Sequence, residues 1–163
     1  MYKAALIHLY LILRTDSMFK QLRTFVAVLG MIGSAAANAD LAIIVHPDYQ
    51  GGELDQAMIK QIFLGTVNEF PSGHTAVPAN HSEGSAGRKD FFEYVLDMSE
   101  TQHKRYWERK AAVGKTGKPV ELNSYIEVLH WVAKTPLGIS YIDKSKVDDS
   151  VKVIYTVLVF DDL

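Results

Sequence analysis

The chain has 163 residues, no cysteine and a formal net charge of −2 at pH 7. The lack of cysteine excludes disulfide bonds and thiolate metal sites, and the slight acidity excludes recruitment of nucleic acid by bulk charge attraction. The length allows one domain with a sizeable hydrophobic core.

The first 39 residues have the pattern of an export signal. A basic segment that begins at Met18 precedes the apolar run Thr24–Ser34, and Ala37-Asn38-Ala39 supplies the small residues that a signal peptidase accepts. We therefore expect translation to start at Met18, cleavage to follow Ala39, and the product to be periplasmic. A second apolar run ahead of Met18 leaves a membrane-anchored N-terminus as the alternative.

The remaining segment, residues 40–163, is expected to form one domain of 124 residues. It keeps 13 of the 17 Lys and Arg residues and 18 of the 19 Asp and Glu residues, which gives a net charge near −5. Because no stretch of it resembles a membrane span, we expect no stable membrane insertion after cleavage.

Strand-like and helix-like segments alternate in the first half of this domain. Leu41–Val45 is apolar throughout, which is typical of a buried strand in a parallel sheet. Apolar residues at helical spacing predict a helix over Leu54–Leu64, ended by Gly65. A short strand is predicted over Thr75–Val77. The next helix starts after Ser85, with an apolar face formed by Phe91, Phe92, Val95 and Leu96.

The second half continues the alternation. Capping boxes at Ser99–Gln102 and Ser124–Glu127 open helices that extend to about Val113 and Lys134. Strands are predicted over Ile139–Ile142 and Val151–Phe160. Strands that alternate with helices predict an α/β sheet with helices packed around it.

The segment around Ser85 carries the main chemical signal. A Gly/Ser loop opens a helix whose first residues are Ser85, Ala86, Gly87 and Arg88. Helix N-termini present unpaired N–H donors and a positive dipole end, and Arg88 adds a charged, forked donor, so this segment suits an oxyanion. The alternative is that Ser85 only caps the helix and Arg88 is solvated. Local geometry alone favours this alternative, because most capped helices bind nothing.

No metal or catalytic motif is recognisable. The five histidines after residue 39 have no metal-ligand spacing. His46 and His81 each follow a predicted strand, where ligands of α/β sheets collect, although a histidine bonded within the protein is the alternative. Ser85 lacks the upstream glycine of a nucleophile elbow, because Glu83 occupies that position. We expect no enzyme, no cofactor and no metal.

The predicted helix of residues 99–113 is basic and aromatic. Tyr106 and Trp107 are interpreted as core packing rather than as a ligand-stacking surface. Its basic cluster is expected to be solvated or to meet an acidic partner, and comprises Lys104, Arg105, Arg109 and Lys110.

Several short motifs follow one another in a specific order. Ile62-Phe63-Leu64-Gly65 ends a predicted helix, Glu83-Gly84-Ser85 opens the next, and Tyr106-Trp107 and Gly138-Ile139-Ser140-Tyr141 follow. This series resembles the phosphate-binding components of bacterial ABC importers, in the periplasmic type 2 binding-protein superfamily, and especially their short, secreted, single-domain relatives. The resemblance covers Leu41–Ile154. It implies a three-layer α/β fold, a single lobe with a mixed or parallel sheet flanked by helices.

The resemblance also implies a binding site. Full-length members hold phosphate between two lobes, partly through an Arg-x-x-x-Ser-Gly-Thr segment. Ser85 matches the serine of that segment, and His81 stands where its arginine would be. Ala86 and Gly87 replace the glycine and the threonine, and Arg88 follows directly as a compensating charge.

The resemblance therefore implies a periplasmic solute-binding protein that is not an enzyme. It would bind phosphate or a similar oxyanion through the five residues just named, with an ABC permease as its partner. The early Gly/Ser-rich phosphate loop and most of the first lobe have no counterpart in this chain. The alternative is therefore an envelope protein-interaction module on the same fold, with a decayed ligand site.

Overall fold

The computed structural model describes residues 40–160 apart from Thr116. The export signal expected over residues 1–39 lies outside the described residues. No helix in the described part of the chain is long and apolar enough to cross a membrane.

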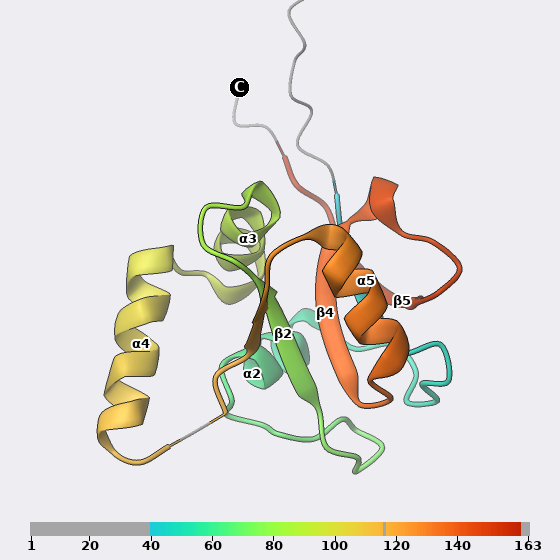
Figure 1. Cartoon of the computed structure of the whole chain (residues 1–163). Coiled ribbons are helices and arrows are strands. Elements are labelled where there is room, and N and C mark those ends of the chain that lie inside the picture. Colours follow the sequence, from blue (N-terminus) through green and yellow to red (C-terminus); the bar gives the residue numbers. More distant parts are fainter. Residues whose placement is uncertain (1–39, 116, 161–163) are drawn as a thin grey trace, which may run out of the picture. The chain divides into compact units, whose positions relative to one another are not determined.

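The centre of the domain is a five-stranded mixed sheet with the strand order β3-β2-β4-β1-β5 (Figure 1). Strand β2 pairs in parallel with β3 and β4, whereas β1 pairs antiparallel with β4 and β5. The strands are β1 (Leu41–Val45), β2 (Val77–His81), β3 (Val120–Leu122), β4 (Gly138–Asp143) and β5 (Lys152–Val157). The predicted α/β fold with a mixed sheet is confirmed.

Three details of the predicted sheet are wrong. The parallel pairing expected for β1 is antiparallel on both sides. Its continuous apolar run has another cause, since β1 is a central strand buried on both faces. The strand predicted at Thr75 starts at Val77, because Thr75 forms an isolated bridge with Glu69. The three-residue edge strand β3 was not predicted, since its burial is confined to Leu122.

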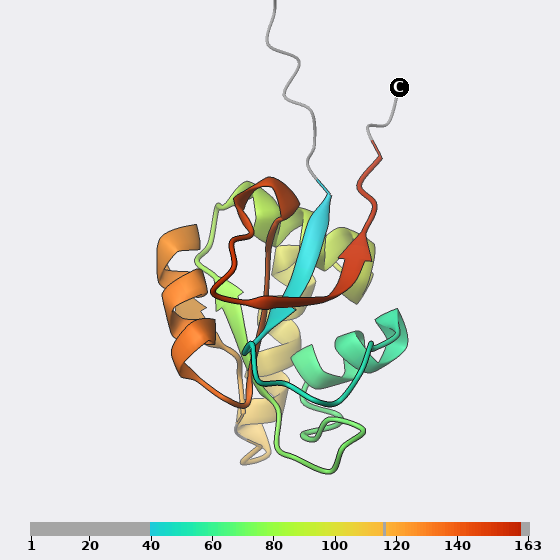
Figure 2. The ribbon, with the colours of Figure 1, turned by 90° about the vertical axis from the view of Figure 1, so that its right-hand side faces the viewer.

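Helices cover both faces of the sheet, so the domain has three layers (Figure 2). The helices are α2 (Gln56–Phe63), α3 (Ala86–Phe91), the π-helix η1 (Phe92–Leu96), α4 (Glu100–Ala112), α5 (Tyr125–Lys134) and the 3₁₀-helix η2 (Lys144–Lys146). The capping box at Ser99 is present on α4. At α5, Ser124 accepts the Glu127 N–H, but the Glu127 carboxylate accepts from the Asn123 N–H, so only half of the predicted box forms.

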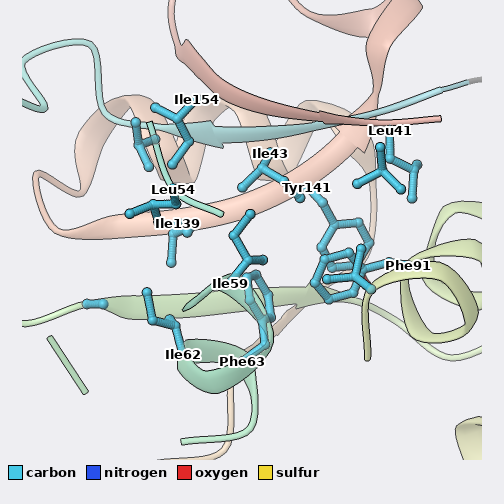
Figure 3. Packing of buried hydrophobic residues seen from close by; sticks show 14 of the residues in the cluster. Leu41, Ile43, Leu54, Ile59, Ile62, Phe63, Phe91, Ile139, Tyr141 and Ile154 are labelled. Atoms are coloured by element: carbon cyan, nitrogen blue, oxygen red, sulfur yellow. The ribbon is translucent and has the colours of Figure 1, made fainter. Parts of the chain in front are cut away.

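Alternate residues of β1 face two separate hydrophobic cores. Leu41, Ile43 and Val45 pack in the core that also holds α2, α3 and η1, whereas Ala42 and Ile44 pack in the core beneath α5. The first core contains an aromatic stack in which the rings of Phe91 and Tyr141 lie parallel, with centroids 3.8 Å apart (Figure 3). Because Phe91 belongs to α3, this stack fixes the helix that starts at Ser85 against the sheet.

Side chains of α4 bind the carbonyl end of α2. The Tyr106 hydroxyl donates to the Leu64 carbonyl at 2.7 Å, and the Lys110 ammonium donates to the carbonyls of Leu64 and Gly65 at 2.7 and 2.8 Å. A cation at a helix C-terminus is favoured by the helix dipole. Lys110 therefore does not belong to a solvated basic face, which corrects that expectation, and Trp107 is buried as expected.

Candidate functional site

A cavity of about 720 Å³ opens in front of Ser85. It lies where the start of α3, the end of η1 and the start of α4 converge. Its lining residues are Gly84, Ser85, Lys89, Glu93, Asp97, Met98, Ser99, Glu100, Thr101 and Gln102. Two helix N-termini therefore border one cavity, although α3 has only six residues before it continues into η1.

Ser85 is the N-cap residue of α3, as predicted, but its side chain makes no capping hydrogen bond. Its hydroxyl oxygen is buried and has no hydrogen-bond partner within the described residues. Its carbonyl accepts from the N–H groups of Arg88 and Lys89 at 3.2 and 3.3 Å. A buried hydroxyl without a partner costs free energy, so this atom has capacity for a ligand or a water molecule.

The charges around this cavity are mixed. Its lining has one lysine, Lys89, and three carboxylates, on Glu93, Asp97 and Glu100. Asp97 has left-handed backbone dihedrals and lies 4.0 Å from the Lys60 ammonium, while Glu100 lies 3.8 Å from Arg88. Two of the three carboxylates therefore have a cationic neighbour.

Arg88 is buried behind α3, with 3% of its surface exposed. Its Nη1 donates to the carbonyl of His81, and its guanidinium lies over the Phe92 ring, 4.7 Å from the centroid. Its Nε lies 3.8 Å from Glu100, and its Nη1 lies 3.8 Å from Glu121. Arg88 thus links strand β2 to α4 and β3, and it does not line the cavity in front of Ser85.

His81 ends β2 and is also buried. Its Nε2 lies 2.8 Å from the Tyr141 carbonyl, and its backbone N–H donates to the Tyr141 hydroxyl at 3.3 Å. Because a carbonyl only accepts, Nε2 carries the proton. Burial holds the pKa of His81 below its usual range, so the ring is neutral at pH 7. His81 joins β2 to β4 beyond their backbone pairing.

The structure thus separates the residues that the sequence grouped together. Ser85 lines the cavity, and Ala86 and Gly87 form the first turn of α3, whereas Arg88 and His81 lie on the sheet side of that helix. Lys89 is the lysine at the cavity, and the sequence pattern did not single it out. The burial of Arg88 did have a sequence signal, since Arg88 precedes Phe91 and Phe92 by three and four residues and shares their apolar face.

The histidines and carboxylates that the structure describes form no metal site. Within residues 40–160, no group of three or more His, Asp and Glu side chains is placed to hold a metal ion. The candidate site is therefore the cavity of about 720 Å³ at the N-terminus of α3.

No family model and no curated protein matches the chain. Solved structures do match its fold, each over 71% of the chain. A Clostridium perfringens protein, described as a phosphate ABC transporter substrate-binding protein and solved with bound phosphate, is 21% identical with a TM-score of 0.58. An ABC-type phosphate transport receptor from Vibrio cholerae is 17% identical with a TM-score of 0.57. PstS from Borrelia burgdorferi is 15% identical with a TM-score of 0.52.

This chain covers only part of each matched protein. The chain covers 45%, 46% and 47% of these three proteins, so it spans less than half of their length. At these identities the likeness describes the fold, and it confirms at that level the resemblance found in the order of motifs. The chain has the fold of phosphate ABC transporter substrate-binding proteins over less than half of their length.

Proposed function

We propose that this chain binds phosphate or a similar oxyanion in the cavity in front of Ser85. It would act in the periplasm as the solute-binding partner of an ABC permease, without catalysis. The observation that carries the proposal is the unpartnered, buried Ser85 hydroxyl at a helix N-terminus, in a fold shared with a protein solved with bound phosphate.

The donors available to an oxyanion come from one short segment. Ser85 would donate its hydroxyl, and the N–H groups of Ala86 and Gly87 stand in the first turn of α3, where helix geometry provides no intrahelical acceptor. Lys89 would supply the positive charge at the cavity. Arg88 would support the loop from behind through the His81 carbonyl. A single lobe leaves the anion partly hydrated, so we expect millimolar rather than submicromolar affinity.

Replacing Ser85 by alanine is expected to weaken phosphate binding about tenfold while leaving the free energy of unfolding unchanged. A hydrogen bond to a charged ligand is lost, whereas no hydrogen bond within the protein is broken. Calorimetric titration of the full chain with sodium phosphate and sodium sulfate at pH 7 measures the affinity. Urea unfolding measures the stability.

Ser99→Ala is the matched control, because Ser99 lines the same cavity but its hydroxyl accepts the Gln102 N–H. This variant should lose about 1 kcal/mol of stability and keep its affinity for phosphate. Equal affinities of the Ser85→Ala variant and the unmodified chain would contradict the proposed site.

A specific observation supports a second candidate, the protein-interaction module. Arg88 is already paired with Glu100 and Glu121, so its charge is compensated within the domain. If the full chain releases no heat with phosphate, sulfate or related anions at millimolar concentration, this second candidate replaces the first.

A further inference from the structure

A second cavity, of about 290 Å³, lies on the other side of α3, against the inner face of α4. It is separate from the first cavity, since the two have no lining residue in common. Its walls come from the β2–α3 loop, α3, α4 and the segment before β3. The lining residues are Glu83, Arg88, His103, Lys104, Trp107, Glu108, Ala111 and Lys118.

The floor of this cavity holds an incompletely bonded guanidinium. Arg88 is 97% buried, yet the hydrogen bond it donates to the His81 carbonyl uses one of its five N–H groups. Its Nε has no hydrogen-bond partner in the part of the chain that the structure describes, and its nearest carboxylate, on Glu100, is 3.8 Å away. A buried charged donor of this kind is expensive unless an acceptor reaches it.

His103 adds a second donor. It is 1% exposed, and its Nε2 accepts from the Trp107 indole N–H at 3.0 Å. The neutral ring must then carry its proton on Nδ1. Burial and the nearby Arg88 charge lower the pKa of His103 to about 4, which is consistent with this neutral form. The ring therefore presents an N–H group, not a lone pair, on its free side.

The rim of the cavity adds charges of both signs. Lys104 and Lys118 are exposed ammonium groups, while Glu83 and Glu108 are exposed carboxylates. Lys118 is engaged by Glu121 at 2.7 Å, whereas Lys104 has no ion pair within the described residues. Arg88 is likewise paired with Glu100 and Glu121, so Lys104 is the lining cation that remains for a ligand.

We propose that this cavity is a second binding site for a small oxyanion, held by the Arg88 guanidinium, the His103 Nδ1–H and the Lys104 ammonium. The ligand is a carboxylate or a phosphate group, since both present the acceptor oxygens that these donors lack. The site has no lining residue in common with the one proposed at Ser85. At this second site Arg88 would contact a ligand directly, which it would not do at the N-terminus of α3.

Trp107 makes the proposal testable by fluorescence. The chain has two tryptophans, so Trp131→Phe leaves Trp107, in the cavity wall, as the single emitter. The full chain with this substitution is titrated with sodium phosphate and with sodium acetate, up to 50 mM, at pH 7 and 0.15 M total ionic strength. We expect a saturable change in Trp107 emission with at least one anion. The anion that binds with the higher affinity shows whether the site prefers a phosphate or a carboxylate group.

Three further variants in the same background locate the binding. Lys104→Ala should weaken it about threefold to fivefold, whereas Arg109→Ala, an equal charge change on α4 outside the cavity, should leave it unchanged. Ser85→Ala should keep a saturable Trp107 signal. No saturable signal with either anion, or equal weakening by Lys104→Ala and Arg109→Ala, would overturn the second site.

Failure of the two proposals can be told apart. A Trp107 signal abolished by Ser85→Ala overturns the second site and leaves the site at Ser85 standing. A Trp107 signal that persists, in a chain whose calorimetric affinity is insensitive to Ser85→Ala, supports the second site and removes the first.

Discussion

Acidification from pH 7 to pH 4 is expected to lower the free energy of unfolding by about 3 kcal/mol through His103 alone. His103 is buried between Phe92 and Trp107, and burial is the main cause that lowers its pKa from 6.5 to about 4. The unfolded chain takes up the proton near pH 6.5, whereas the folded chain resists it until about pH 4. Stability is therefore lost as the pH falls through this window, and His81, whose pKa is also lowered, acts in the same direction.

Urea unfolding at several pH values between 7 and 4 measures this loss. His103→Gln keeps an acceptor for the Trp107 N–H but cannot titrate, so its stability should fall by about 3 kcal/mol less than that of the unmodified chain. His130→Gln is the control, because His130 is exposed on α5. Parallel pH profiles for the unmodified chain and His103→Gln would show that His103 does not carry the effect.

Replacing Arg88 by methionine is expected to destabilise the fold by about 2 kcal/mol. The substitution removes the hydrogen bond to the His81 carbonyl and leaves Glu100 without its cationic neighbour. Glu100 and Glu121 are each 36% exposed at the side chain, so solvent limits the cost to less than that of a fully buried ion pair.

The matched control is Arg105→Met, which removes an exposed arginine from α4 and should change stability by less than about 0.5 kcal/mol. The loss of stability in Arg88→Lys should lie between those of Arg88→Met and Arg105→Met, because lysine keeps the charge but not the planar guanidinium. Chemical denaturation measures all three. An Arg88→Met variant as stable as Arg105→Met would mean that the guanidinium contributes nothing to the link between β2 and α4.

Local patterns predicted most of the helices, because their signals lie within a few residues. The Ser99 capping box and the apolar spacing of Phe91, Phe92, Val95 and Leu96 describe α4 and the α3–η1 segment well. The direction of β1 was mispredicted for a physical reason. Burial on both faces removes the alternation that distinguishes antiparallel strands, and only the long-range pairing to β4 and β5 determines their direction.

The candidate site was predictable in part. Ser85 was placed at a helix start by its loop and by the family pattern, and that placement is confirmed. Arg88 was expected at the anion site but is buried on the other face of the helix. Its spacing to Phe91 and Phe92 favours that buried face. The partners Glu100 and Glu121 come from α4 and β3, so no local pattern identifies them. Whether Ser85 contacts an anion stays a prediction.

The Arg88–Glu100 pair joins the walls of both cavities. Glu100 lines the cavity in front of Ser85, and Arg88 lines the one against α4, with 3.8 Å between their charged atoms. An oxyanion that draws the guanidinium away from Glu100 leaves a bare carboxylate beside Ser85. Two anions would then oppose each other through one shared residue pair, and each would weaken the other by the same factor. The domain would thus respond to the ratio of its ligands as well as to their amounts.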